Sequence, residues 1–161
     1  MIRFPRQLLI DAPTIWQPAL DGDPTCRRLF DRHYSRRRYA DGRRPKLFVG
    51  PGEKLVLTTA DRRALFVWRK FIDDAIPTQA GVNCAVFRRE AGPVASEMIL
   101  EAEQWAWRRW SGQRLYTYVN ASRIRSTNPG YCFLCAGWSR CGRTKTGKTI
   151  LEKYPERIPH D

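Results

Sequence analysis

The feature that most restricts the fold of this chain is a change in hydrophobic period at residue 93. From there to residue 110, apolar side chains recur at helical spacing and predict the longest helix. Before it, runs rich in β-branched and aromatic residues predict strands at 54–59, 65–71 and 83–89. Successive strands followed by one long helix exclude a doubly wound nucleotide-binding fold and indicate an α+β protein.

Further elements lie on either side of this block. Asp23 followed by Pro24 is typical of a helix start and predicts a helix over 24–37. Other segments predict a strand at 115–120, a short helix from Asn128-Pro129 to Gly137, and two short strands within 140–154 around Thr146-Gly147. We therefore expect a single domain, 1–161, with a mixed, mainly antiparallel central sheet flanked by helices.

The charge of the chain points to a polyanionic partner. The 29 Lys and Arg residues exceed the 16 Asp and Glu residues, which gives a net charge of +13. Most of the basic residues are Arg, which binds phosphates through two hydrogen bonds and stacks on bases, so we expect double-stranded DNA as partner. The expected nucleic-acid-binding residues are Arg36, Arg37, Arg38, Tyr39, Arg43, Arg44, Arg123, Arg125, Lys145 and Lys148.

Several protein classes are disfavoured by the same composition. No apolar run approaches the ~18 residues of a membrane helix, and the first residues do not form a signal peptide, so we expect a cytoplasmic protein. The five cysteines favour free thiols or a metal site over disulfides. Cys132, Cys135 and Cys141 offer three thiols where structural zinc takes four ligands, so buried free thiols are favoured and no metal ligand is assigned.

Residues Gly142 to Thr149 match the phosphate-loop pattern GxxxxGK[ST] letter for letter. That loop requires a following helix, and the short remainder of the sequence is interrupted by Pro155 and Pro159. We interpret the motif as a hairpin turn with basic residues.

Two motifs resemble those of a known superfamily. The stretch from Arg89 through Gly92 to Val94 lies between a strand and the long helix and matches Q/R-x-x-G-x-G/A by its Arg and first Gly. The stretch Phe133 to Trp138 aligns with Y-x-K-x-G-F, with Phe133 in place of the usual tyrosine acid. With the element order, these motifs resemble the GNAT acyltransferases. The resemblance implies acetyl-CoA or another activated acyl donor, bound by Arg89, Gly92, Val94, Ser96 and Asn128.

A narrower resemblance covers about Thr25 to Lys153. It is carried by His33-Tyr34-Ser35, Phe66-Val67-Trp68, Ser96-Glu97, Tyr118-Val119-Asn120 and Asn128 to Phe133. Together these stretches resemble the GNAT-like phage Mom DNA-modification proteins. That family adds a carbamoylmethyl group to the exocyclic amine of adenine in DNA and so protects phage DNA from restriction. The resemblance implies a phage-encoded enzyme with a catalytic centre of His33, Tyr34, Ser96, Tyr118 and Tyr131.

Each of these residues also has a purely structural interpretation. His33 on the apolar side of its helix is either a core histidine or a general base or metal ligand. Ser96 suits a helix start as well as a donor site, and Asn128 suits a helix cap. Tyr118 shares its strand face with Tyr116 and Asn120, which is either a solvated face or a base pocket.

Two other functions are compatible with the sequence. One is an ordinary acyl-CoA-dependent N-acetyltransferase, which would bind CoA and need no DNA. The other is a non-catalytic basic nucleic-acid-binding domain, which would show salt-dependent binding and leave nucleosides unaltered. The sequence leaves open the donor, the DNA context, the need for a metal and the oligomeric state.

Overall fold

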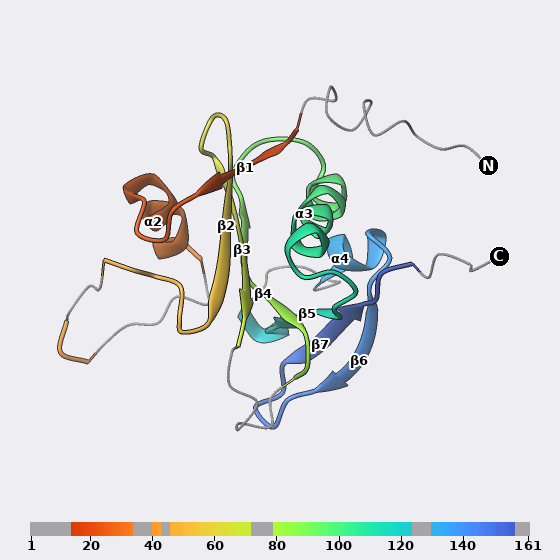
Figure 1. Cartoon of the computed structure of the whole chain (residues 1–161). Helices are drawn as coiled ribbons and strands as arrows, with labels where there is room; N and C mark the ends of the chain where they lie inside the picture. The colour runs from red at the N-terminus through yellow and green to blue at the C-terminus, as the bar shows by residue number, and fades with distance from the viewer. Residues whose placement is uncertain (1–13, 34–39, 43–45, 72–78, 124–129, 157–161) are drawn as a thin grey trace.

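The computed structural model describes residues 14–33, 40–42, 46–71, 79–123 and 130–156. In these ranges the chain forms one open seven-stranded sheet with three α-helices (Figure 1). The strands are β1 (Trp16–Ala19), β2 (Glu53–Thr59), β3 (Ala64–Lys70), β4 (Val82–Arg89), β5 (Leu115–Val119), β6 (Ser139–Arg143) and β7 (Thr149–Lys153). The helices are α2 (Pro24–Asp31), α3 (Ala95–Arg109) and α4 (Tyr131–Cys135), with a 3₁₀ turn η1 (Ala121–Arg123).

The sheet has the strand order β1-β2-β3-β4-β5-β7-β6. All neighbouring strands are antiparallel except β4 and β5, which run parallel across the α3 crossover. The predicted α+β class and mainly antiparallel sheet are therefore confirmed. The predicted strands at 54–59, 65–71 and 83–89 and the helix over 93–110 correspond to β2, β3, β4 and α3.

Strand β1 is an element that the sequence did not reveal. It is only four residues long, contains Pro18 and pairs with β2 at the edge of the sheet. The Glu101 carboxylate of α3 accepts hydrogen bonds from the N–H groups of Ile15 and Trp16, at 2.8 and 2.7 Å. The strand is thus fixed by a contact with a residue far away in the sequence.

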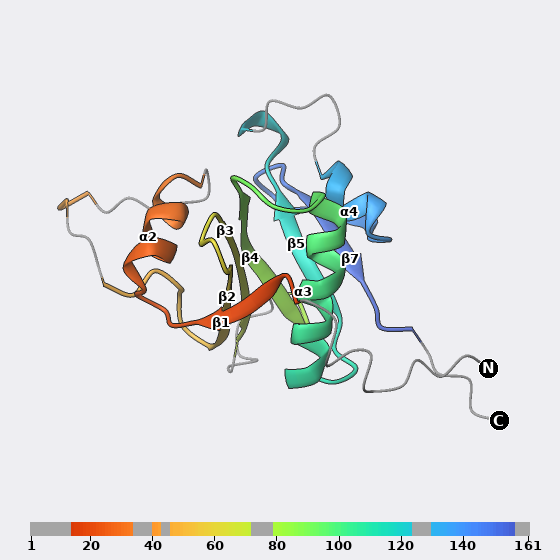
Figure 2. The same cartoon turned by 90° about the horizontal axis from the view of Figure 1, so that it is seen from above.

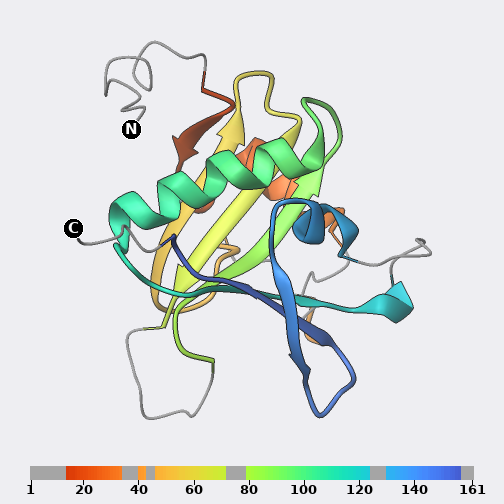
Figure 3. The ribbon, with the colours of Figure 1, turned by 90° about the vertical axis from the view of Figure 1, so that its right-hand side faces the viewer.

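The two faces of the sheet carry separate apolar clusters. Helices α3 and α4 lie on one side of the sheet and α2 on the other (Figures 2 and 3). Helices α3 and α4 pack on one face, where Trp68 and Trp138 stack at 6.3 Å between ring centroids. Helix α2 and residues 46–51 cover part of the other face, around Val67. Apolar side chains on both faces explain why β3 reads as a continuous apolar run rather than an alternating one.

Helix α2 begins as predicted but ends earlier. The Asp23 carboxylate accepts hydrogen bonds from the N–H groups of Thr25 and Cys26, which confirms the N-cap. The helix ends at Asp31, so the prediction of a helix through Arg32 and His33 is wrong; residues 34–37 lie outside the described ranges. The last turn is tightened, since the His33 N–H donates to the carbonyl of Phe30, three residues earlier. The Arg88 guanidinium donates a hydrogen bond to the Arg32 carbonyl oxygen just beyond the helix.

Helix α4 starts later than the sequence indicated. Its N-cap is Gly130, with φ +80°, so the prediction that Asn128 caps this helix is wrong. A Cβ on Gly130 would lie 2.9 Å from Leu151 Cδ1, so both the positive φ and the close approach favour glycine at this position. The final hairpin is confirmed: Thr144 and Lys148 close the turn between β6 and β7, and a strand follows the phosphate-loop-like motif instead of a helix.

Strands β4 and β5 pair over a short distance only. Their parallel register joins Val82 to Leu115 and continues to Cys84 and Thr117. Beyond this point β4 runs on to Arg89 and β5 to Val119 outside that register. The two strands therefore diverge, which opens the sheet at its middle.

Among the helices in the described ranges, none has the length and apolar character required to cross a membrane.

Candidate functional site

A pocket of about 380 Å³ lies on the α2 face, where β4 and β5 diverge. One wall comes from Phe30 of α2 and the segment 47–51. The floor comes from β3 and β4, and the far side from β5 and the β6–β7 turn. Its lining residues are Phe30, Leu47, Phe48, Val49, Gly50, Pro51, Val67, Arg69, Asn83, Cys84, Ala85, Val86, Tyr118, Asn120 and Lys148.

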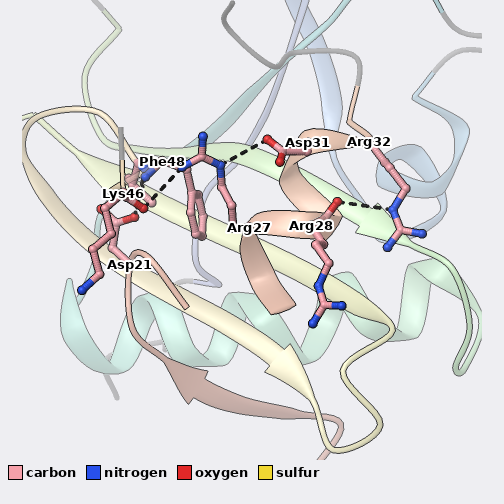
Figure 4. A network of polar contacts seen from close by, with 8 residues as sticks. Asp21, Arg27, Arg28, Asp31, Arg32, Lys46 and Phe48 are labelled. Carbon is pink, nitrogen blue, oxygen red and sulfur yellow. Dashed lines mark hydrogen bonds and ion pairs between the residues drawn. The ribbon is translucent and has the colours of Figure 1, made fainter. Parts of the chain in front are cut away.

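The wall formed by residues 47–51 is held in place by Asp21 (Figure 4). One oxygen of this carboxylate accepts hydrogen bonds from the N–H groups of Phe48 and Val49, at 2.8 and 3.2 Å. The other oxygen binds the Lys54 ammonium at 2.8 Å. The Phe48 ring stacks on Phe30 at 5.2 Å between centroids, which joins this wall to α2.

Arg69 and Asn83 lie opposite each other on β3 and β4 and both line the pocket. Asn83 is 5% exposed. Within the described part of the chain, Asn83 Oδ1 and Arg69 Nε are buried and have no hydrogen-bond partner. A buried polar atom without a partner is costly, and such atoms in native proteins often mark a site where another group binds.

The guanidinium of Arg69 is enclosed by its neighbours. It lies 4.4 Å from the centroid of the Phe71 ring, and a Cβ added to Gly50 would lie only 2.0 Å from Arg69 Nη1. Burial lowers the pKa of Arg69, although an arginine remains charged at neutral pH. No Asp or Glu is among the described residues that line the pocket. The pocket therefore offers positive charge and hydrogen-bonding groups without an acid to neutralise them.

Tyr118 and Asn120 project into this pocket from the end of β5. Burial raises the pKa of Tyr118, so its hydroxyl is protonated at neutral pH and can donate a hydrogen bond. The Tyr116 ring contacts Tyr118 edge to face at 5.6 Å, and burial raises the pKa of Tyr116 to about 12. The shared strand face predicted from the sequence is therefore a pocket wall rather than an open solvated face.

The structure brings together only some of the predicted site residues. Tyr118 and Lys148 line the pocket, whereas His33, Ser96 and Tyr131 are not among its lining residues. Lys145 is exposed on the β6–β7 turn, and the backbone of Arg123 ends the η1 turn. Nine predicted residues lie outside the described ranges: Tyr34, Arg36, Arg37, Arg38, Tyr39, Arg43, Arg44, Arg125 and Asn128.

His33 lies beyond the end of α2, beside the last residues of β4. Burial and, to a smaller extent, the positive charge of Arg88 lower the pKa of His33 to about 4. A hydrogen bond with the Phe87 backbone acts in the opposite direction and raises the pKa. The imidazole is therefore neutral at neutral pH and can accept a proton, although a pKa this low makes it a weak base. The position on an apolar helix face that the sequence suggested is not observed.

The pH dependence of stability tests this environment of His33. The unfolded imidazole takes up a proton near its usual pKa of 6.5, while the folded one does so only near 4. Acidification from pH 7 to 4.5 therefore favours the unfolded state. We expect the wild type to lose about 1–2 kcal/mol more unfolding free energy over this range than His33→Gln, measured by urea denaturation. Equal losses in both proteins would contradict the assigned environment.

The loop between β4 and α3 contains the residues implied to bind a donor. The Arg89 guanidinium donates to the carbonyl oxygens of Pro93 and Gly92, at 2.7 and 3.1 Å, so it is engaged by its own loop. Val94 is the N-cap of α3 and has no side-chain hydrogen bond to the helix, while Ser96 lies half-buried in the first turn. Among the described residues, no side chain caps the first backbone N–H groups of α3. They fit an anionic group, and Arg89 would join only by releasing its carbonyl partners.

Tyr131, Cys135 and Cys141 are not among the residues that line the pocket, whereas the buried Cys84 is. Tyr131 is 60% exposed at the start of α4, and a hydrogen bond with Cys135 raises its pKa. Cys135 and Cys141 are exposed rather than buried, so the prediction of buried thiols is wrong for both. Among the described residues, no group of three or more His, Cys, Asp or Glu side chains is arranged to hold a metal ion.

The comparisons with known proteins add no identification. No protein-family model, curated protein or solved structure matches the chain. The candidate site rests on its geometry, and the family likenesses remain hypotheses.

Sequence reasoning missed Arg69 and Asn83. Asn83 is a polar residue within the apolar part of β4, and Arg69 directly follows the apolar run of β3; this was the available signal. The strand periodicity gave no indication that the two residues pair across β3 and β4 or that a pocket opens above them.

Proposed function

We propose that this protein is a DNA-modifying transferase that acts on the exocyclic amine of adenine. The group transferred is carbamoylmethyl, as the Mom-like motifs imply. The observation that carries the proposal is the pocket at the divergence of β4 and β5. Its lining combines aromatic walls, two cations, a tyrosine hydroxyl and two amides, without any carboxylate among the described lining residues. Such a lining suits an uncharged aromatic base next to phosphates.

The charge distribution supports DNA as the substrate. Lys148 lies at the pocket, and Arg140, Arg143 and Lys145 are exposed on the same β6–β7 hairpin. Lys and Arg bind phosphates through salt-dependent contacts that carry much of the affinity for DNA. A base in the pocket would therefore have its flanking phosphates near a basic hairpin.

The chemistry requires an activated carbon donor and a route for one proton. The adenine amine forms the new N–C bond, the donor's leaving group departs with the bonding electrons, and the amine loses a proton. The Tyr118 hydroxyl can hydrogen-bond the leaving group or the base, because it is protonated at neutral pH. To give the carbamoylmethyl product, the bond must form at the methylene carbon of a donor that already carries this group on its leaving group, since acyl transfer from acetyl-CoA would give an N-acetyl group instead. The N–H groups at the start of α3 are the proposed contact for an anionic part of this donor.

The test is to express the protein in a bacterium, digest the genomic DNA to nucleosides and measure their masses. We expect a new deoxyadenosine derivative with the wild type and at least ~10-fold less of it with Tyr118→Ala. The matched control is Tyr154→Ala, which removes an exposed tyrosine away from this pocket.

Two outcomes would contradict the proposal. An unchanged nucleoside profile from soluble, folded protein that still binds DNA in a salt-dependent manner would favour a non-catalytic binding domain. Acetylation of a protein or a small amine by this chain without DNA would favour an ordinary acetyltransferase.

A further inference from the structure

We propose that Arg69 and Asn83 together recognise the Watson–Crick edge of a nucleobase that has left its helix. The identity of that base as adenine rests on the proposed function. Neither residue was singled out by the sequence or by the family likenesses. The proposal stands on their placement opposite each other on neighbouring strands, at the floor of one pocket.

The two unpartnered atoms have complementary hydrogen-bonding capacities. Arg69 Nε carries one N–H and can only donate, whereas Asn83 Oδ1 can only accept. Both atoms are buried, and neither has a partner among the described residues. Because a buried polar atom without a partner is costly, a ligand that hydrogen-bonds to both atoms gains affinity.

This pair restricts the chemistry of the ligand. A phosphate or carboxylate would accept a hydrogen bond from Arg69. Its oxygens would also face the Asn83 oxygen, and two acceptors cannot form a hydrogen bond with each other. The matching ligand has an acceptor next to an N–H donor on one planar edge. Adenine offers these groups as its ring N1 and its exocyclic amine, and the stacked Phe30 and Phe48 rings supply an apolar wall for its plane.

The same edge is occupied by the partner base in duplex DNA. A base held by Arg69 and Asn83 must therefore be unpaired, either in a single strand or rotated out of the duplex. The Asn83 amide oxygen accepts a hydrogen bond from the exocyclic amine, so it holds the amine in place and, being neutral and without a proton to give, does not protonate it. The pair thus explains how the proposed enzyme selects an extrahelical base and orients its reacting nitrogen.

Two substitutions separate recognition from folding. Asn83→Asp keeps the shape of the side chain but places a carboxylate opposite Arg69, so the two side chains pair with each other instead of with a base. Gly50→Ala adds a Cβ only 2.0 Å from Arg69 Nη1, which displaces the guanidinium without removing its charge. Gly142→Ala is the matched control, because its added Cβ meets only an ordinary contact at 3.9 Å.

The experiment measures binding of fluorescent DNA duplexes by anisotropy at fixed salt. One duplex carries adenine opposite an abasic site, and the reference carries the same adenine paired. We expect the wild type and Gly142→Ala to bind the unpaired adenine at least ~10-fold more tightly than the paired one. Asn83→Asp and Gly50→Ala should lose this preference while they keep the affinity for paired DNA and the thermal stability of the wild type.

The outcomes are distinct. Loss of the preference in a folded Asn83→Asp or Gly50→Ala protein supports the pair, and an undiminished preference in both overturns it. A wild type without preference for the unpaired adenine also overturns it. Equal binding of unpaired thymine and adenine overturns the choice of adenine, because thymine also presents an acceptor next to an N–H donor on its Watson–Crick edge. A preserved preference with no modified nucleoside in the genomic DNA overturns the transferase proposal alone and leaves the recognition pair standing.

Discussion

Replacement of Lys153 by Met is expected to lower the free energy of unfolding by about 3–5 kcal/mol. The Lys153 ammonium lies 2.8 Å from Glu103 Oε2 and 2.7 Å from the Ala136 carbonyl oxygen. Glu103 is 1% exposed, and its other carboxylate contact is the Trp138 indole N–H at 2.7 Å. Removal of the ammonium leaves a buried carboxylate without its cation and detaches β7 from α3 and α4.

The effect should depend on pH in a direction that identifies its cause. Burial already raises the pKa of Glu103, and loss of Lys153 removes the ammonium that opposes this rise and leaves only the Trp138 hydrogen bond to oppose it. A protonated Glu103 costs less to bury, so the deficit of Lys153→Met should shrink on acidification. Chemical denaturation at pH 7.5 and 5 measures this, and a deficit that is equal at both values would contradict the explanation.

Two control proteins complete this experiment. Glu156→Gln alters an exposed carboxylate and should change stability by no more than about 0.5 kcal/mol. The double variant Glu103→Gln/Lys153→Met removes both charges and should recover part of the loss, because no unpaired buried charge remains. A double variant as unstable as Lys153→Met alone would show that the lost packing of the lysine stem is responsible.

Replacement of Asp21 by Ala is expected to disable the pocket. The carboxylate holds the N–H groups of Phe48 and Val49 and the ammonium of Lys54, and its side chain is mostly buried. Its removal leaves two backbone donors without their acceptor and frees the wall formed by residues 47–51. We expect a loss of about 2–3 kcal/mol in unfolding free energy and at least ~10-fold weaker binding of unpaired adenine.

The control for this substitution is Asp31→Ala. Asp31 pairs with Arg27 within α2 at 3.2 Å (Figure 4), and such helix pairs contribute only about 0.3–0.5 kcal/mol. Denaturation and anisotropy measure the two effects separately. If Asp21→Ala bound unpaired adenine as tightly as the wild type, the wall formed by residues 47–51 would not belong to the site.

The local signals in the sequence predicted most of the secondary structure. The change of period at residue 93 located α3, and Asp23 located the start of α2, because its side chain acts on the N–H groups two and three residues ahead. The end of α2 carries no comparable local signal, and the Arg32 carbonyl just beyond it is bound by a distant residue, Arg88. Strand β1 was missed since Glu101 of α3 supplies the hydrogen bonds that hold it.

The candidate site was only partly predictable. Alternation along 115–120 placed Tyr118 and Asn120 on one face, and both line the pocket. Lys148 was expected to bind nucleic acid from a basic hairpin turn. Its place at the pocket follows from the packing of the β6–β7 hairpin beside β5. Arg69 and Asn83 carried no motif, so only the register of β3 and β4 shows that they face each other.

The sequence by itself determined the α+β class, the basic character and most element boundaries, since these depend on residue type and on spacing within one segment. Tertiary structure alone decided where β4 and β5 separate, which polar atoms are buried without partners, and which chain segments enclose them. Those properties depend on pairs of residues far apart in the chain, such as Asp21 with Phe48 and Gly50 with Arg69. Their proximity is set by the packing of the whole sheet, which periodicity within a segment does not encode.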